Sequence, residues 1–444
     1  MNNLTFFLDD YPQNLLNPRE VMDHNAKLVT SFMYQPIFLR EKGQIIPNGI
    51  IDESVNGKIR IKFGKSLWSD GSRVTANDFY NSLRYILVNN PLSSYLNFIK
   101  GVSEYVKGNV SLDDIKMKVE GDYFCAEVYR SDLYKGVFSN INFSPKKFEN
   151  GELDRSITAG GYKLIKQYKN KIVLIRNQNL INLPEYVYFR IEKDFLKQLK
   201  RVNEEKYSYT GFTSTNFSQI GEINTFPINS GIHFRIIISS EVLNIINLSK
   251  FRYEIKEEIR KNIELKKLIE LSDDTLNLVP IDGKQLRKRE QTVNFLYPNY
   301  YPNDILVRLT SKILKRVGCG VTEKSVSLSK FMTVDIQDYD MILELVEPIT
   351  DNRLDKWIEQ IRFIEQCKKS DYVSLINEYL EPNNFYQDIE SRIEAIIFSN
   401  SLCVDIGLFK QYYTKSEGAP QLILTDDGLI KIISTVENSE IRER

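Results

Sequence analysis

Several short stretches of the chain have the hydrophobic pattern of strands. Ile59, Ile61 and Phe63 alternate with Arg60 and Lys62, and a period of two residues is typical of a strand with one buried face. Longer apolar runs bounded by turn residues predict strands that are buried on both faces. These runs are Leu4–Leu8, Tyr186–Ile191, His233–Ile238 and Val293–Tyr297.

Other segments repeat their apolar residues at helical spacing. The expected helices run from about His24 to Ile37, from Thr75 through Leu87, from about Tyr253 to Leu271, from an Asn303 cap to Val317, and from about Leu354 to Leu380. A strand is expected again from Ile397 to Phe409. Because strands alternate with helices in the second half of the chain, this part is predicted to be a mixed α/β lobe.

The segment from Leu67 to Leu83 combines a turn with a capped helix. Asp70-Gly71 supplies the turn, because glycine tolerates positive φ and aspartate can bond its own backbone. Thr75 is a good N-cap, and Asp78 three residues later can complete a capping box. This local interpretation carries no information about function.

The amino-acid sequence of the same segment resembles a known signature, W-x-D-G-x-x-V-T-A-x-D-F/V-x-x-S-L. It belongs to bacterial extracellular solute-binding proteins of family 5, which deliver oligopeptides, dipeptides, nickel chelates or opines to ABC transporters. The residues that match are Trp68, Asp70, Gly71, Val74, Thr75, Ala76, Asp78, Ser82 and Leu83.

Further matches follow in the order that this family has, from about Leu16 to Tyr413. Leu16-Asn17-Pro18 is similar to the L-D-P entry of the family, and the loop 98–108 is similar to I-x-G-x-x-x-Y-x-x-G. The segment 158–164 resembles G-T-G-P-Y-K-L, although Thr158 and Gly161 depart from it. Tyr339-Asp340-Met341-Ile342-Leu343 is similar to Y-D-M-x-L.

The resemblance implies a fold and a division of the chain. The fold is α/β, of the periplasmic-binding-protein-like type II, with two mixed α/β lobes joined by hinge strands and an extra subdomain in the first lobe. The expected parts are 1–40 (lobe I), 41–157 (extra subdomain of lobe I), 158–236 (lobe I), 237–400 (lobe II) and 401–444 (return to lobe I and C-terminal tail). A chain of 444 residues is long enough for several lobes.

Composition narrows the range of functions. Lys plus Arg and Asp plus Glu both number 59, so the chain has no net charge that would favour nucleic acid as a partner. Its two histidines, His24 and His233, and four scattered cysteines show no zinc spacing and no catalytic triad. We therefore expect no metal, no cofactor and no enzymatic activity.

The N-terminal residues bear on localisation. Met1 is followed by a strand pattern without a basic region, a long apolar stretch or a cleavage site, and no run reaches transmembrane length. The expected location is extracytoplasmic, in the periplasm or at the cell surface, if an export signal was removed, and cytoplasmic if Met1 is the native start. Membrane insertion is not expected, and a monomer is the default of the family.

In a two-lobed receptor of this kind the ligand lies between the lobes, so the candidate contacts come from loops that face the other lobe. Tyr34 and Gln35 follow a predicted helix, Tyr162 follows the Gly160-Gly161 turn, and Phe212-Thr213 stands in a loop rich in Gly, Ser and Thr. Core packing explains each aromatic residue equally well, and an exposed turn explains Thr213.

The stretch from Leu343 to Arg353 supplies the other candidates. In peptide-binding relatives the motif continues as Y-D-M-x-L-x-x-W-x-x-D, and its Asp holds the free amino group of the peptide. Here Val346 replaces the Trp and Ile349 replaces the Asp. The candidate contacts are Glu344, Glu347, Asp351 and Arg353, with Glu347 or Asp351 as amine partner and Arg353 as a clamp for a carboxylate.

The resemblance therefore predicts a solute-binding protein that captures a peptide or peptide-like ligand for the permease of an ABC importer. Two alternatives stay open. One is a cytoplasmic ligand sensor or regulator with the same fold, and the other is a scaffold recruited to a biosynthetic role.

Overall fold

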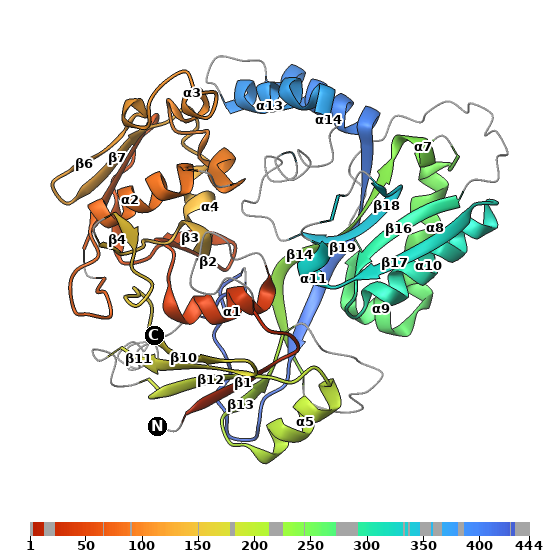
Figure 1. The fold of residues 1–444 in the computed structure, drawn as a ribbon, viewed down its shortest axis with the longest axis horizontal. Coiled ribbons are helices and arrows are strands. Elements are labelled where there is room, and N and C mark those ends of the chain that lie inside the picture. Colours follow the sequence, from red (N-terminus) through yellow and green to blue (C-terminus); the bar gives the residue numbers. More distant parts are fainter. Residues whose placement is uncertain are drawn as a thin grey trace.

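The computed structural model describes residues 3–12, 23–64, 66–88, 91–149, 151–177, 183–212, 225–243, 245–271, 292–331, 334–335, 338–346, 357, 366–380, 386–426 and 428–430. These residues form three bodies arranged around a common centre (Figure 1). We call them lobe I, the subdomain and lobe II, and define each by its sheet.

Lobe I is built on a five-stranded sheet of order β10-β11-β12-β1-β13. Its strands are β1 (Leu4–Leu8), β10 (Tyr162–Tyr168), β11 (Lys171–Arg176), β12 (Tyr186–Ile191) and β13 (Ser208–Thr210). Strand β1 is parallel to both of its neighbours. It lies within the sheet, so its apolar run is almost entirely buried, as a central parallel strand requires. Helices α1 (His24–Met33) and α5 (Phe195–Glu204) belong to the same lobe.

Helix α1 is shorter than its apolar spacing predicts. Asp23 caps it by accepting a hydrogen bond of 2.8 Å from the backbone N–H of Ala26. The helix ends at Met33, and Tyr34 is already extended. The prediction of a helix to Ile37 was wrong because Pro36 disfavours the helical conformation of Gln35.

Gly160 permits a close contact between the end of α1 and the start of β10. Its backbone N–H donates to the carbonyl oxygen of Met33 at 2.7 Å. A Cβ atom at this position would lie 2.5 Å from the carbonyl oxygen of Phe32, so the two backbones would have to separate. We expect Gly160→Ala to lower the free energy of unfolding by about 1–3 kcal/mol, as overpacking generally does. Urea unfolding would measure the loss, and an unchanged midpoint would contradict this packing.

The subdomain contains a four-stranded sheet of order β4-β5-β7-β6. These strands are β4 (Ile50–Asp52), β5 (Lys58–Phe63), β6 (Met117–Glu120) and β7 (Tyr123–Glu127), and the separate hairpin β2 (Phe38–Glu41) to β3 (Gln44–Pro47) precedes them. The smaller elements are η2 (Pro91–Leu96), α3 (Val102–Val106), η3 (Leu112–Asp114), α4 (Tyr134–Phe138), η4 (Ile141–Phe143), β8 (Phe148–Glu149) and β9 (Glu152–Leu153).

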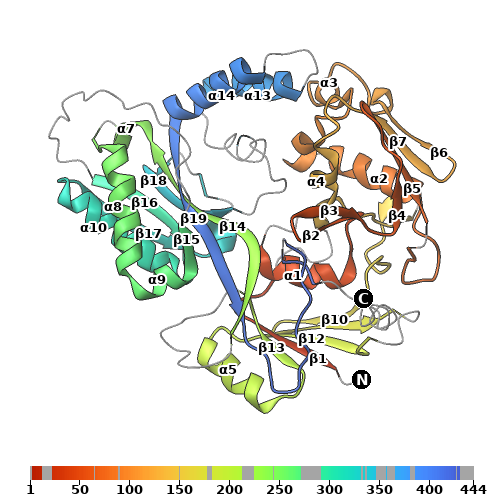
Figure 2. The ribbon, with the colours of Figure 1, turned by 180° about the vertical axis from the view of Figure 1, so that it is seen from behind.

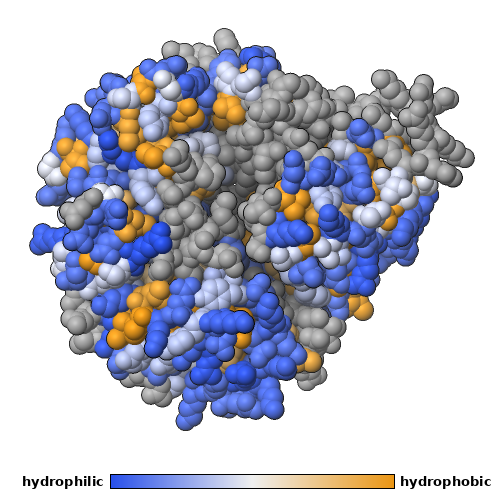
Figure 3. All heavy atoms as spheres, viewed as in Figure 1, coloured by the Kyte–Doolittle hydropathy of each residue, from blue (hydrophilic) through white to orange (hydrophobic). Residues whose placement is uncertain are grey.

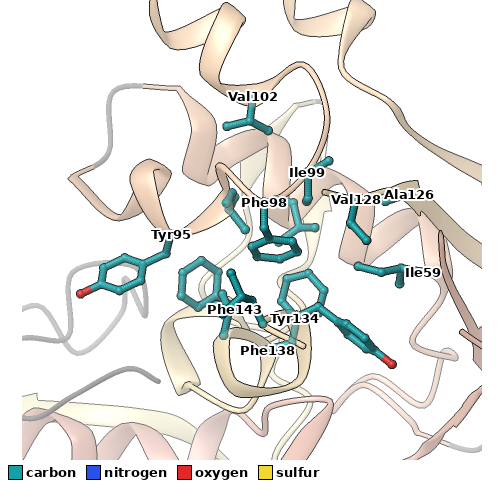
Figure 4. Packing of buried hydrophobic residues seen from close by; sticks show 14 of the residues in the cluster. Ile59, Tyr95, Phe98, Ile99, Val102, Ala126, Val128, Tyr134, Phe138 and Phe143 are labelled. Atoms are coloured by element: carbon teal, nitrogen blue, oxygen red, sulfur yellow. The ribbon is translucent and has the colours of Figure 1, made fainter. Parts of the chain in front are cut away.

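Aromatic rings fill the centre of the subdomain. Phe138 lies against Phe98, Tyr134 and Phe143, with ring centroids 6.0–6.5 Å apart (Figure 4). Helix α2 (Ala76–Leu87) adds Phe79, whose ring meets that of Phe138 edge-on at 5.1 Å. The contacts of Phe138 with Phe79, Phe98 and Tyr134 are edge-to-face, a preferred geometry for aromatic pairs, so the subdomain has a core of its own.

Lobe II contains a six-stranded sheet of order β15-β19-β14-β18-β16-β17. The strands are β14 (Phe226–Ser239), β15 (Ile269–Leu271), β16 (Thr292–Pro298), β17 (Gly320–Val326), β18 (Met341–Val346) and β19 (Ser401–Tyr413). Helices α7 (Ser240–Leu243), α8 (Leu248–Lys261), α9 (Ile263–Leu268) and α10 (Asn303–Arg316) lie on the outer face of this sheet, and α11 (Leu328–Phe331) lies on the face turned to the centre (Figures 1 and 2).

Three predicted boundaries in lobe II were wrong. The single helix expected up to Leu271 is broken at Asn262, whose side chain caps α9, and its last three residues form β15. Asn303 is the first residue of α10 instead of its cap, and its side-chain amide donates to the carbonyl oxygen of Pro298 at 3.0 Å. Residues 397–400 belong to the helix α14, so the returning strand starts only at Ser401.

Two further helices, α13 (Gln366–Leu380) and α14 (Tyr386–Asn400), bridge lobe II and the subdomain (Figures 1 and 2). Helix α14 runs directly into β19. On the opposite side of the molecule, the long antiparallel pair β14 and β19 connects the lobe II sheet with lobe I. The chain therefore joins lobe II to lobe I at one end and contacts the subdomain at the other.

Candidate ligand-binding site

The lower ends of β14 and β19 are fixed in the core of lobe I. The ring of Phe226 stacks on that of Tyr413 at 5.2 Å, and Tyr413 also contacts Tyr209 and Phe212. The backbone N–H of Thr210 donates to the carbonyl oxygen of Thr414 at 2.9 Å. The two strands thus pass from a packed anchor in lobe I into the sheet of lobe II, which is where a hinge between the lobes would lie.

The central strands of lobe II have two different faces. Phe234, Leu343 and Val404 point to the apolar core shared with the outer helices. Alternate residues point to the opposite face, which is turned toward the centre of the molecule (Figure 1).

A row of three charged side chains crosses this inner face. Arg235 on β14 pairs in register with Glu344 on β18 and with Asp405 on β19. Directly opposite residues on neighbouring strands have Cβ atoms about 4.5–5.5 Å apart, so these three charged side chains leave the sheet next to one another. We call Arg235, Glu344 and Asp405 the charged row.

The charged row changes from buried to accessible along its length. Glu344 is 1% exposed and Arg235 is 6% exposed, whereas the side chain of Asp405 is 34% exposed. His233, two residues before Arg235, places its Nδ1 3.2 Å from Oδ2 of Asp405 and is 29% exposed. The end of the row that a ligand can reach therefore consists of Asp405 and His233.

Asp9 follows β1 in lobe I, and the side-chain amide of Asn25 donates to its Oδ1 at 2.7 Å. On lobe II, Tyr300 follows β16. Burial raises the pKa of the Tyr300 phenol, the hydrogen bond with Asn303 opposes that shift, and the carboxylate of Asp9 raises the pKa further. A charge of lobe I therefore acts on a side chain of lobe II.

The structure places the candidate aromatic residues of lobe I in its core. Tyr34 is 1% exposed and its hydroxyl has no hydrogen-bond partner; burial raises the pKa of this phenol. The hydroxyl of Tyr162 donates to the carbonyl oxygen of Pro184 at 2.9 Å. Phe212 is buried against Tyr413. These three share one apolar cluster.

The other candidates are distributed differently. Gln35 is half-buried, and its Oε1 lies 3.4 Å from the side-chain amide of Asn48. Glu344 is in the charged row and is thus in lobe II, apart from the lobe I candidates. Thr213, Glu347, Asp351 and Arg353 lie outside the described residues.

Sequence reasoning did not select Arg235, Asp405 or His233 as candidate contacts. A signal was present. Each of the three strands has an apolar run that is interrupted by a charged residue, at Arg235, Glu344 and Asp405. A charge inside a buried strand is costly unless it is paired, so three such strands predict that the charges meet.

The described residues show neither a group of His, Cys, Asp or Glu that could hold a metal ion nor a helix of the length and apolarity needed to cross a membrane. Hydrophilic side chains are spread over the face seen in Figure 3, and the apolar ones form separate areas.

No family model and no curated protein sequence matches the chain. Solved structures do match it. The murein tripeptide-binding protein MppA of Escherichia coli has a TM-score of 0.72 at 12% identity, over 97% of this chain and 99% of that one. Listeria monocytogenes OppA bound to peptide has a TM-score of 0.73 at 15% identity, over 97% of both chains. The pheromone receptor PrgZ has a TM-score of 0.73 at 14% identity, over 98% and 99%.

The chain therefore has the fold of the two-lobed solute-binding proteins. In particular, it has the arrangement of those that were solved as peptide-binding proteins, along nearly its whole length. The predicted fold, two mixed α/β lobes joined by hinge strands with an extra subdomain, is confirmed.

Proposed function

We propose that this protein captures a peptide or peptide-like ligand between its two lobes and delivers it to the permease of an ABC importer. The observation that carries the proposal is the agreement in fold over 97% of the chain with MppA and with peptide-bound OppA. The two long strands β14 and β19, which join the lobes, support a clamp that closes on its ligand.

We propose that the ligand contacts lobe II at the accessible end of the charged row. Asp405 and His233 are half-buried on the inner face, whereas Arg235 and Glu344 are buried. A few polar anchors in a largely apolar site are the usual way to orient a small ligand. Gln35 is the proposed polar contact from lobe I.

The remaining site proposals rest on the resemblance of the sequence. Glu347 or Asp351 would hold the amino group of a free peptide, Arg353 would hold a carboxylate, and Thr213 would contact the ligand from lobe I. Tyr34, Tyr162 and Phe212 would act by shaping the lobe I wall, because they are buried in its core. No catalysis is proposed, since the solved proteins of this fold are binding proteins.

The same reasoning extends to the cellular setting. We propose a monomer outside the cytoplasm, with lobe I at 1–40, 158–236 and 401–444, its subdomain at 41–157 and lobe II at 237–400 as parts of the chain. His233, Arg235 and Asp405 fall within the lobe I segments by this division, although their strands belong to the sheet of lobe II. Lobe II as so defined includes α13 and α14, which touch the subdomain across the proposed boundary.

Peptide binding should be visible as stabilisation. In a thermal-shift panel of di- to pentapeptides, we expect at least one peptide to raise the melting temperature, because a ligand at 100 times its Kd stabilises the folded state by about 2.7 kcal/mol. Native mass spectrometry of gently purified protein would show whether a peptide is carried along.

N-acetylated copies of the active peptides serve as the control. Loss of stabilisation on acetylation would support Glu347 or Asp351 as the amine partner, whereas retention would remove that assignment. No bound solute and no shift over the whole panel would refute capture of free peptides and would favour the sensor or the recruited scaffold.

A further inference from the structure

The α13–α14 hairpin touches the subdomain on the side of the molecule opposite the place where β14 and β19 enter lobe I (Figure 1). Both connections of lobe II are therefore visible in one view, β14 and β19 to lobe I and the hairpin to the subdomain. Any opening of lobe II about β14 and β19 must change the contact of the hairpin or bend the junction between Asn400 and Ser401.

A buried hydrogen bond joins the two bodies. The side-chain amide of Asn97, just after η2, donates to Oδ1 of Asn377 on α13 at 2.8 Å. Asn97 is 6% exposed and Asn377 is 7% exposed. When this contact separates, water can satisfy both amides, so the bond contributes the modest net stability of an ordinary hydrogen bond. A polar pair of this kind suits a contact that forms and breaks.

A cation–π contact lies on the same helix. The guanidinium of Arg130 is 5.0 Å from the ring centroid of Tyr379. Asp132 orients Arg130 by accepting two hydrogen bonds, at 2.6 and 2.9 Å. Hydrogen bonding to Asp132 raises the pKa of Arg130, so its charge is permanent. Two independent side-chain contacts thus fix α13 against the subdomain.

The apolar residues of the hairpin also pack with the subdomain. They belong to the same buried cluster as Leu92, Tyr95 and Phe98, and none of the described hairpin residues belongs to the core of lobe II. The members are Trp357 and, from the hairpin, Tyr372, Leu375, Ile376, Leu380, Ile389 and Ile393.

Internal hydrogen bonds make the hairpin a unit. The indole N–H of Trp357 donates to Oε1 of Glu394 on α14 at 2.9 Å, and the hydroxyl of Tyr372 on α13 donates to the carbonyl oxygen of Trp357 at 2.9 Å. Because α14 is continuous with β19, a displacement of β19 moves α14. The hairpin therefore transmits this displacement to the contact between α13 and the subdomain.

We propose that the α13–α14 hairpin is a clasp that holds lobe II against the subdomain and sets the balance between closed and open forms. The proposal rests on the proposed function in one respect only, namely that the closed form retains a bound ligand. Its test needs no ligand, so a failure of peptide binding and a failure of the clasp can be told apart.

The test compares Asn377→Ala with wild type by hydrogen–deuterium exchange and small-angle X-ray scattering, both on ligand-free protein. We expect amides of η2 and of α13 to exchange about fivefold faster together, which is the effect of losing one net hydrogen bond from a local opening, and the radius of gyration to increase. Tyr379→Leu removes the second contact and should act in the same direction.

Asn262→Ala is the matched control. It removes an asparagine N-cap that contributes a similar free energy to stability and lies entirely within lobe II. It should leave η2 and α13 unchanged. Equal exchange in wild type and both clasp variants would overturn the proposal. Faster exchange with an unchanged radius of gyration would also overturn it, because the contact would then be local packing only.

Discussion

Replacing Trp68 by alanine is expected to lower the free energy of unfolding by about 3–5 kcal/mol, the usual cost of removing a large aromatic side chain from a core. Trp68 is 1% exposed. Its indole N–H donates to Oδ2 of Asp78 at 3.2 Å, and the same oxygen accepts from the backbone N–H and the hydroxyl of Thr75 at 2.9 and 2.8 Å. The substitution thus leaves a cavity and weakens the cap of α2.

Urea unfolding followed by far-UV circular dichroism would measure the loss. Trp68→Phe is the matched variant, because it keeps an aromatic ring in the site while it loses the N–H donor and part of the indole volume. We expect it to cost about 1–3 kcal/mol, less than alanine, because one hydrogen bond is lost and a smaller cavity is left. Equal losses for the two variants would mean that the ring itself contributes little, contrary to its burial.

The role of Trp68 explains why the sequence signature predicts the fold so well. Thr75 and Asp78 form the expected capping box, and Oδ1 of Asp70 accepts from the backbone N–H and the hydroxyl of Ser72 at 2.8 and 2.6 Å. These hydrogen bonds lower the pKa of Asp70. Such residues stabilise a local strand–turn–helix structure, which any protein of this fold needs whatever its ligand.

For the same reason the signature could not locate the ligand. The candidate aromatic residues Tyr34, Tyr162 and Phe212 lie in the core of lobe I, and periodicity does not distinguish a core aromatic residue from one in a cleft. The charged row depends on the register of three strands that are far apart in the sequence. Register follows from tertiary packing, so the sequence marks the three charged residues as unusual but does not show which of them lie opposite each other.

Some helix boundaries were predicted wrongly because local polar contacts set them, and the spacing of hydrophobic residues does not reveal such contacts. Asn262 interrupts an apolar pattern that continues on both sides of it, because its Oδ1 accepts from the backbone N–H groups of Glu264 and Leu265 at 3.0 Å. A cap inside a continuous pattern starts a new helix. The hydrophobic pattern marked Ile259 and Leu265, which are buried, but also Ile263, which is 77% exposed, and it assigned one helix where the structure has two helices and a strand.

His24 leads to the second large prediction, a loss of stability in mild acid. It is the first residue of α1, and its ring lies 5.9 Å from that of Phe212. Both ring nitrogens are shielded from solvent and have no hydrogen-bond partner. Burial, with the positive charge of Lys27 as a second cause, lowers the pKa of His24 to about 3. The folded protein therefore keeps this imidazole neutral at pH values where an unfolded chain protonates it.

Because the unfolded chain binds the extra proton, the contribution of His24 to the free energy of unfolding is constant above the unfolded pKa of about 6.5 and falls as the pH drops from there toward 3. The slope is at most about 1.4 kcal/mol per pH unit, so between pH 7 and pH 4.5 we expect a loss of about 2–3 kcal/mol.

His24→Leu fills the same apolar site without a titrating group. The difference in unfolding free energy between wild type and this variant, measured by urea at each pH, cancels the carboxylates that both share. We expect that difference to shift against the wild type below pH 6.5, and two parallel curves would show that water reaches the ring of His24 in solution.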